Sequence, residues 1–152
     1  VNYSNYSFKY SSFSTILNGK LEYYDGKNVI GVPKNKYTIG LDFETKKGWY
    51  LYGTYNFLDD VFTDFGNQNQ VKGYALLHSK IGYKHSFGKF DLDAYFAGNN
   101  LTNQINYSFL FLGNNINDSD PDSNYAAGIA TDVTPGYHKA YFFGGLNLKY
   151  NF

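Results

Sequence analysis

The 152-residue sequence carries no formal net charge and no cysteine, and it is rich in aromatic residues and glycine. Its 13 basic and 13 acidic residues are spread along the chain, which excludes the concentrated positive patch of a nucleic-acid-binding surface. No segment approaches the ~20 consecutive apolar residues of a membrane-spanning helix, and the lack of cysteine excludes disulfides and thiolate metal sites. The 17 Tyr, 14 Phe and 16 Gly against 3 Pro predict one all-β domain.

Alternation of apolar and polar residues predicts six strands. In chain order, they cover residues 3–13, 37–43, 49–57, 75–83, 90–98 and 142–152. The first is the least regular and carries Tyr6, Phe8 and Tyr10 on one side. In the last, one face is apolar through Leu148, while the other turns polar at Asn147.

The connections between these strands alternate in length. Residues 45–47 and 85–89 form tight turns, whereas residues 14–34, 58–72 and 113–139 are long and rich in Asn, Asp and Gly. Short turns on one side and long loops on the other are typical of outer-membrane β-barrels. We therefore expect antiparallel transmembrane barrel strands, with the carboxy terminus in the periplasm and the long loops extracellular. An aromatic girdle near one interface would contain Phe43, Trp49, Tyr83, Phe90 and Phe152.

A barrel interior of this kind is polar, and the sequence offers side chains for it. Asp91 and Asp93 lie on the same face of one strand, and carboxylates require water or polar partners rather than a sealed core. The residues that we predict to face the lumen are His78, Lys80, Asp91, Asp93, Asn147 and Lys149. Their apolar neighbours along the same strands would face outer-membrane lipid.

Three segments resemble the end of a TonB-dependent outer-membrane receptor. Residues 31–36, Gly-Val-Pro-Lys-Asn-Lys, resemble the entry to a late barrel strand of that family. Residues 98–103 contain an Asn-Leu-x-Asn element, followed by Tyr107, that is similar to the penultimate-strand region and distinguishes receptors from porins. Residues 144–152 resemble the closing strand with its terminal Phe. The resemblance covers most of the chain, from Gly31 to Phe152.

The resemblance implies a barrel of about 22 strands that imports a siderophore-like or other nutrient ligand, with a plug domain and TonB as partners. It also implies that the barrel-assembly machinery recognises the closing strand, through Leu146, Leu148, Tyr150 and Phe152. Residues 1–152 contain no plug and about six strands, fewer than the eight or so of the smallest barrels. We therefore expect the carboxy-terminal portion of a longer chain, or a segment that completes a barrel with other chains of a larger membrane assembly.

Two other classes of protein fit parts of the pattern. A small stand-alone outer-membrane barrel with an adhesive or structural role would need further strands from residues 14–34 or 104–112. A soluble β-sandwich binding module is disfavoured, because so many aromatic residues at strand ends suit a membrane wall better than a two-sheet core of this size.

Catalytic and metal-binding interpretations are weaker than structural ones. His78, His85 and His138 lie on separate segments without ligand spacing. Residues 117–124 are rich in oxygen ligands but lack the central Gly and closing Glu of an EF-hand, which favours a solvated loop. Asp91 and Asp93 have no accompanying nucleophile on the strand, so lumen polarity explains them better than catalysis. We predict no enzyme activity, no metal and no cofactor.

Aromatic residues of the connections are a further candidate set, because receptor loops of this kind commonly contact ligands. For each individual residue, packing of loop on loop is the better explanation, so none is assigned to a ligand. The set comprises Tyr23, Tyr24, Phe62, Phe65, Tyr107, Phe109, Phe111, Tyr125 and Tyr137.

Overall fold

The computed structural model describes residues 1–17, 19–112, 130–136 and 139–152. Its main element is one six-stranded antiparallel sheet in which each strand pairs with its neighbours in the order β1-β4-β5-β8-β9-β12. The strands are β1 (Asn2–Asn5), β4 (Asn35–Glu44), β5 (Trp49–Leu58), β8 (Tyr74–Phe87), β9 (Phe90–Asn99) and β12 (Tyr141–Tyr150). The prediction of an all-β, antiparallel fold with six principal strands is confirmed. Within the described ranges, no helix is long and apolar enough to cross a membrane.

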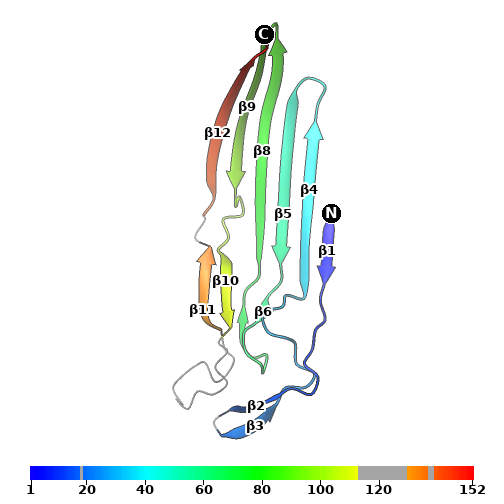
Figure 1. Ribbon diagram of the computed structural model, residues 1–152, viewed down its shortest axis with the longest axis vertical. Helices are drawn as coiled ribbons and strands as arrows, with labels where there is room; N and C mark the ends of the chain where they lie inside the picture. Colours follow the sequence, from blue (N-terminus) through cyan, green and yellow to red (C-terminus); the bar gives the residue numbers. More distant parts are fainter. Residues whose placement is uncertain (18, 113–129, 137–138) are drawn as a thin grey trace.

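Three two-stranded hairpins interrupt this sheet and lie at one end of it (Figure 1). They pair β2 (Ser14–Leu17) with β3 (Lys20–Tyr23), β6 (Val61–Phe62) with β7 (Gln70–Val71), and β10 (Asn106–Leu112) with β11 (Ala130–Gly136). The predicted long loops therefore contain short ladders. The segments that a stand-alone barrel would need, around β2, β3 and β10, pair in these hairpins and do not extend the six-stranded sheet.

The predicted first strand is wrong beyond Asn5. β1 pairs with β4 over only four residues, and then the amide N–H of Tyr6 donates to the carbonyl of Lys34. Farther along, Val29 N–H donates to Phe8 and Tyr10 N–H donates to Lys27, so this segment pairs irregularly with the chain that leads into β4. Ser12 then takes a positive φ of 57°, which ends extended backbone.

The opposite end of the sheet has only tight turns (Figure 1). β8 runs four residues farther than predicted, so that Phe87 pairs with Phe90 and the turn shrinks to Gly88 and Lys89. Between β4 and β5, Gly48 has φ of 93°, and a Cβ there would lie 1.9 Å from the Lys84 carbonyl oxygen. Only glycine fits this turn. The carboxy terminus lies at this short-turn end, whereas β1 enters the sheet at mid-height.

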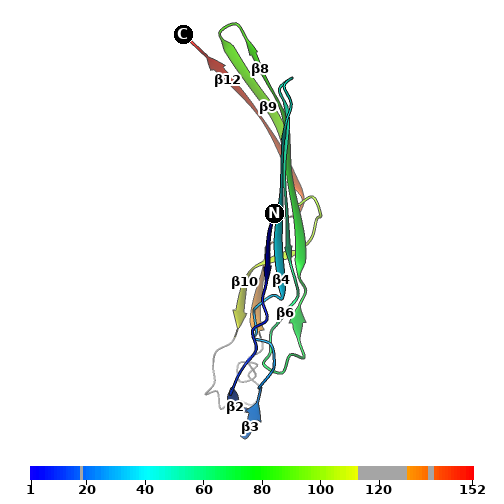
Figure 2. The ribbon, with the colours of Figure 1, turned by 90° about the vertical axis from the view of Figure 1, so that its right-hand side faces the viewer.

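The sheet is a single twisted layer, and no second layer covers either face in the described part of the chain (Figure 2). Consequently, large side chains that would form a core lie on the surface: Leu41 is 55% exposed, Phe96 55% and Leu146 69%. Domains normally bury an apolar sheet face against a second layer. This face therefore requires a cover that the described residues do not supply.

Candidate functional site

The strand register separates the side chains of the sheet into two faces. One face, here called the apolar face, carries Ile39, Leu41, Phe43, Trp49, Leu51, Tyr55, Phe57, Leu77, Ile81, Tyr83, Phe90, Leu92, Phe96, Phe142, Leu146, Leu148 and Tyr150. The opposite face, here called the polar face, carries Asp42, Glu44, Tyr50, Tyr52, Thr54, His78, Lys80, Lys84, Asp91, Asp93, Tyr95, Asn99, Asn147 and Lys149. The polar face is the candidate functional surface, because its groups come together from five strands.

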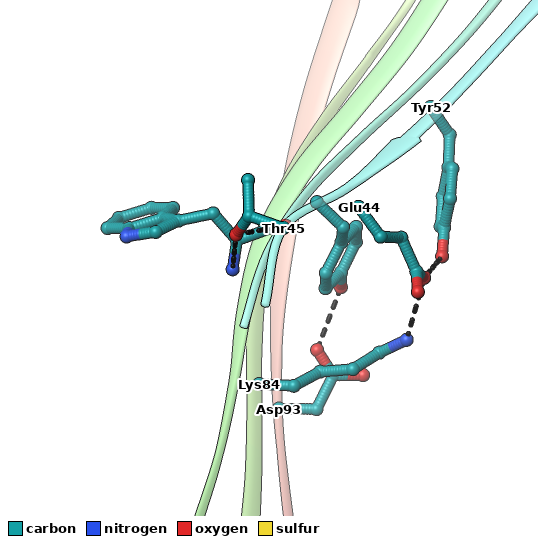
Figure 3. Close-up of polar contacts among 7 residues, drawn as sticks. Glu44, Thr45, Tyr52, Lys84 and Asp93 are labelled. Atoms are coloured by element: carbon teal, nitrogen blue, oxygen red, sulfur yellow. Dashed lines mark hydrogen bonds and ion pairs between the residues drawn. The ribbon is translucent and has the colours of Figure 1, made fainter. Parts of the chain in front are cut away.

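An ion pair joins β4 to β8 on the polar face (Figure 3). The Lys84 ammonium lies 3.3 Å from the Glu44 carboxylate, and the Tyr52 hydroxyl donates a hydrogen bond to the same carboxylate. Both charged side chains are about half exposed, so the pair contributes little stability by itself. The pair neutralises the negative charge of Glu44 on the polar face.

A second group of contacts centres on Tyr50, which is only 2% exposed. Its hydroxyl donates to the Asp93 carboxylate at 2.8 Å, so β5 reaches across β8 to β9 (Figure 3). The Lys84 ammonium lies 4.8 Å from the Tyr50 ring centroid, and that of Lys80 lies 3.9 Å from the Tyr95 centroid. Cation–π contacts of this kind contribute about 0.5–1 kcal/mol at exposed sites.

Glycines make room for these rings. Gly82 lies opposite Tyr50 on one side and Tyr95 on the other, and Gly145 lies opposite Tyr95. A Cβ at Gly82 would come within 2.2 Å of the Tyr50 ring, and one at Gly145 within 2.5 Å of the Tyr95 ring. Each ring therefore lies over a glycine backbone instead of projecting outward. The result is a flat polar wall.

The six residues that the sequence predicts for the lumen all lie on the polar face. Four of them, Asp91, Asp93, Asn147 and Lys149, line one shallow hollow of about 380 Å³ near the short-turn end. The other two, His78 and Lys80, line a separate hollow of about 190 Å³ with Tyr52 and Asn99. The structure thus divides the predicted set into two groups.

The carboxylates and histidines of this face hold structural hydrogen bonds. Asp91 accepts from the Ser86 hydroxyl at 2.6 Å and from the Asn151 amide at 2.8 Å. His78 Nδ1 lies 3.0 Å from the Asn99 amide oxygen, which assigns a proton to that nitrogen. His85 belongs to the apolar face, away from His78. Across the described residues, no three acidic or histidine side chains are grouped to hold a metal ion. His138 and residues 117–124 lie outside the described residues.

The Asn-Leu-x-Asn element closes the loop-side end of β9. Asn100 is 4% exposed; its side chain accepts from Gln104 N–H at 3.2 Å and donates to the Gln104 carbonyl at 2.9 Å. The β8–β9 ladder ends at Ser79, so the earlier residues of β8 have no partner on β9. The turn supplies one instead: Leu101 N–H donates to the Leu77 carbonyl, and the Thr102 hydroxyl donates to the Ala75 carbonyl. This motif therefore ends β9 while it satisfies the backbone of the longer β8.

The two connections at residues 6–34 and 59–73 pack into one unit, here called the loop body. The Asn67 side chain accepts from Asn28 N–H at 2.7 Å and donates to its carbonyl at 3.0 Å. Phe65 lies at the centre of an aromatic cluster, with ring centroids 5.8, 5.0 and 5.5 Å from those of Tyr10, Phe13 and Tyr24. Burial, with Glu22 and Asp64 nearby, raises the pKa of Tyr24 above its usual range.

The structure shows where several of the predicted aromatic loop residues lie. Tyr24 and Phe65 pack against each other, as expected for loop-on-loop packing, whereas Tyr23 is 69% exposed on the hairpin β2–β3. Phe62 lies on β6 and lines a hollow of about 330 Å³ with Lys9 and Lys34. The side chains of Tyr107, Phe109 and Phe111, and all of Tyr125 and Tyr137, lie outside the described residues.

Solved structures that share this arrangement of antiparallel strands, short turns and long connections include BauA, the ferric preacinetobactin receptor from Acinetobacter baumannii, and FecA, a ferric citrate transporter in its unliganded form. Each aligns over 83% of this chain with a TM-score of 0.53, at 19% identity for BauA and 18% for FecA. The chain spans only 16% and 18% of their lengths. No protein-family model matches the sequence, and no curated protein sequence does.

Proposed function

We propose that residues 1–152 form part of the wall of an outer-membrane β-barrel that belongs to a TonB-dependent receptor. The observation that carries this proposal is the single-layer sheet with one apolar and one polar face. A water-soluble domain would cover its apolar face with a second layer. A bilayer supplies that cover instead, and it allows alternating side chains to face lipid and lumen.

In this role the apolar face contacts lipid and the polar face lines the lumen. His78, Lys80, Asp91, Asp93, Asn147 and Lys149 then face the lumen or a plug domain. The network of Tyr50, Asp93, Lys80 and Lys84 supports this assignment, because it satisfies charged groups on the wall while it leaves donors and acceptors exposed to a polar partner. Plug movement driven by TonB would take place in other parts of the receptor.

We assign the orientation by analogy with outer-membrane barrels, whose short turns are periplasmic. The short turns and the carboxy terminus face the periplasm, and the loop body faces the exterior. Leu146, Leu148, Tyr150 and Phe152 provide the signal for the barrel-assembly machinery; their exposure on the apolar face of an edge strand supports this role. Residues 1–152 then form the carboxy-terminal portion of the barrel, and the remaining wall comes from the rest of the receptor or from other chains of a larger assembly.

The transported ligand is of a siderophore-like class or another nutrient. Support comes from the two matched structures, which are a receptor for ferric preacinetobactin and a transporter for ferric citrate. The loop body would contribute to the outer vestibule, where ligands first bind.

The first test is the intact mass of the native protein after extraction from the outer membrane with detergent. A receptor has a mass several-fold larger than the 17.3 kDa of this chain and migrates differently on gels before and after heating. Uptake of ⁵⁵Fe supplied as ferric citrate or ferric preacinetobactin is then compared between cells with and without the gene. A mass near 17.3 kDa would overturn the receptor proposal and favour a small barrel.

A further inference from the structure

Aromatic rings form a continuous belt across the short-turn end of the apolar face. The belt runs from β5 to the carboxy terminus through Trp49, Tyr83, His85, Phe87, Phe90, Tyr150 and Phe152, with successive centroid distances of 4.9, 5.9, 6.1, 5.7, 5.1 and 5.1 Å. Trp49 is 54% exposed and Phe87 48%. The Trp and Tyr rings of the belt are amphipathic, and such rings prefer the headgroup level of a bilayer.

Basic residues lie directly beside this belt. The two turns at this end consist of Thr45-Lys46-Lys47-Gly48 and Gly88-Lys89, and all three lysines are exposed. Only Gly48 separates Lys46 and Lys47 from the belt residue Trp49. The Lys89 ammonium lies 5.7 Å from the centroid of the Tyr150 ring.

The acidic side chains near this end belong to the other face, and three of them have partners there. Glu44 is paired with Lys84, and Asp93 accepts from Tyr50. Asp91 accepts from Ser86 and Asn151. Asp42 also lies on the polar face, opposite Tyr52. In the two turns at this end, the charged side chains are therefore all lysines, although the chain as a whole is neutral.

We infer that these turns bind the phosphate headgroups of anionic phospholipids in the leaflet at the short-turn end. The inference rests on the proposed membrane location and adds a partner to it. Rings at the headgroup level fix how deeply the sheet sits in the bilayer. Lys46, Lys47 and Lys89 extend beyond the rings to the phosphate layer. Each lysine near an anionic membrane surface strengthens binding about fivefold.

The test is native mass spectrometry of the whole detergent-extracted protein with an equimolar mixture of phosphatidylglycerol and phosphatidylethanolamine. The measured quantity is the ratio of the two lipids that remain bound. The variant Lys46→Gln/Lys47→Gln/Lys89→Gln is compared with Lys20→Gln/Lys27→Gln/Lys139→Gln, which removes three exposed lysines outside the belt end. Heat-modifiable gel migration verifies that both variants are folded.

The wild-type protein should favour phosphatidylglycerol, and the turn variant should lower the ratio by about fivefold or more, while the control variant leaves it unchanged. An equal decrease in both variants, or no preference in the wild type, would overturn the inference and leave the membrane proposal intact. A protein that stays dispersed without detergent would overturn the membrane proposal itself.

Discussion

In the six-stranded sheet most large apolar side chains lie on the surface, whereas the loop body packs one group of them, around Phe65, against one another. Leu146 and Phe96 are more than half exposed, but Val61 of the loop body is 1% exposed and Tyr24 is 9% exposed. The loop body also satisfies its backbone internally, since Asp64 accepts from the amide groups of Gln68 and Asn69. The loop body therefore contains a small buried core of its own.

This difference indicates where the stability of each region originates. The sheet is held by ladder hydrogen bonds and by whatever covers its apolar face, so its stability depends on the surrounding medium. The loop body depends on ring packing and on the two hydrogen bonds between Asn67 and Asn28, which are internal. Substitutions can therefore separate an external solvent effect from an internal packing effect.

The largest expected effect comes from one charge placed on either face of β12. Leu146 and Asn147 are neighbours on opposite faces of the strand. In a bilayer, Leu146→Arg should lower the free energy of unfolding by about 2–4 kcal/mol, because the charge enters lipid. Asn147→Arg should change it by less than about 1 kcal/mol, because the polar face is wet. Urea unfolding of the whole protein in lipid vesicles measures both, and equal effects would contradict a lipid-facing Leu146.

Removal of the central ring of the loop body should have the next largest effect. Phe65→Ala deletes the ring that contacts Tyr10, Phe13 and Tyr24, at an expected cost of about 2 kcal/mol, less than for a fully buried Phe. Hydrogen exchange should accelerate at Gly31 and Thr63, which form backbone hydrogen bonds in this body. Exchange in β9 should stay unchanged. Faster exchange throughout the sheet would show that the two regions unfold together.

The sequence predicted the principal sheet well, because strict two-residue alternation determines both the strand and its face. Five of the six strands appear where expected, and the turn chemistry around Gly48 and Gly88 fits their ends. The segment at residues 6–13 failed, because its spacing of Tyr and Phe imitates a strand while its partners lie in an irregular incoming segment. Neighbouring residues could not reveal that competition.

The contacts of the polar face were less accessible to sequence reasoning. Tyr50 and Asp93 are 43 residues apart and meet only because the register places Tyr50 opposite Gly82 and Asp93 opposite Lys84, two residues farther along β8. The two hollows that divide the predicted lumen residues depend on the same register. In the sequence, the Asn-Leu-x-Asn element showed only a resemblance to a family. The fold shows that it also provides hydrogen-bond donors to the backbone of β8.

A glycine comparison tests how closely the polar face is packed. Gly82→Ala places a Cβ within 2.2 Å of the Tyr50 ring, whereas Gly40→Ala, on the same face, meets nothing within 4 Å. We expect Gly82→Ala to destabilise the protein by about 1–3 kcal/mol through displacement of the ring. Gly40→Ala should be neutral or slightly stabilising, since alanine restricts the unfolded chain. Adding Tyr50→Ser to Gly82→Ala should recover part of the loss, and a lack of recovery would contradict the ring clash.

The smallest effect concerns pH at the base of the loop body. The Lys72 ammonium and the Gly73 N–H both bind the Asp60 carboxylate, each at 2.7 Å, and these bonds lower the pKa of Asp60 below its usual range. An unfolded Asp has a pKa of about 3.9. Stabilisation by Asp60 is therefore complete above that value, and it is lost as pH falls through the lower pKa of the folded state. As the pH falls below about 4, the Gly73 amide should become less protected from hydrogen exchange, relative to its intrinsic rate. Asp60→Asn should remove this dependence.

The Gly31 amide, bonded to the Phe62 carbonyl, is the internal control. A parallel loss at Gly31 would assign the pH effect to the whole loop body instead of to Asp60.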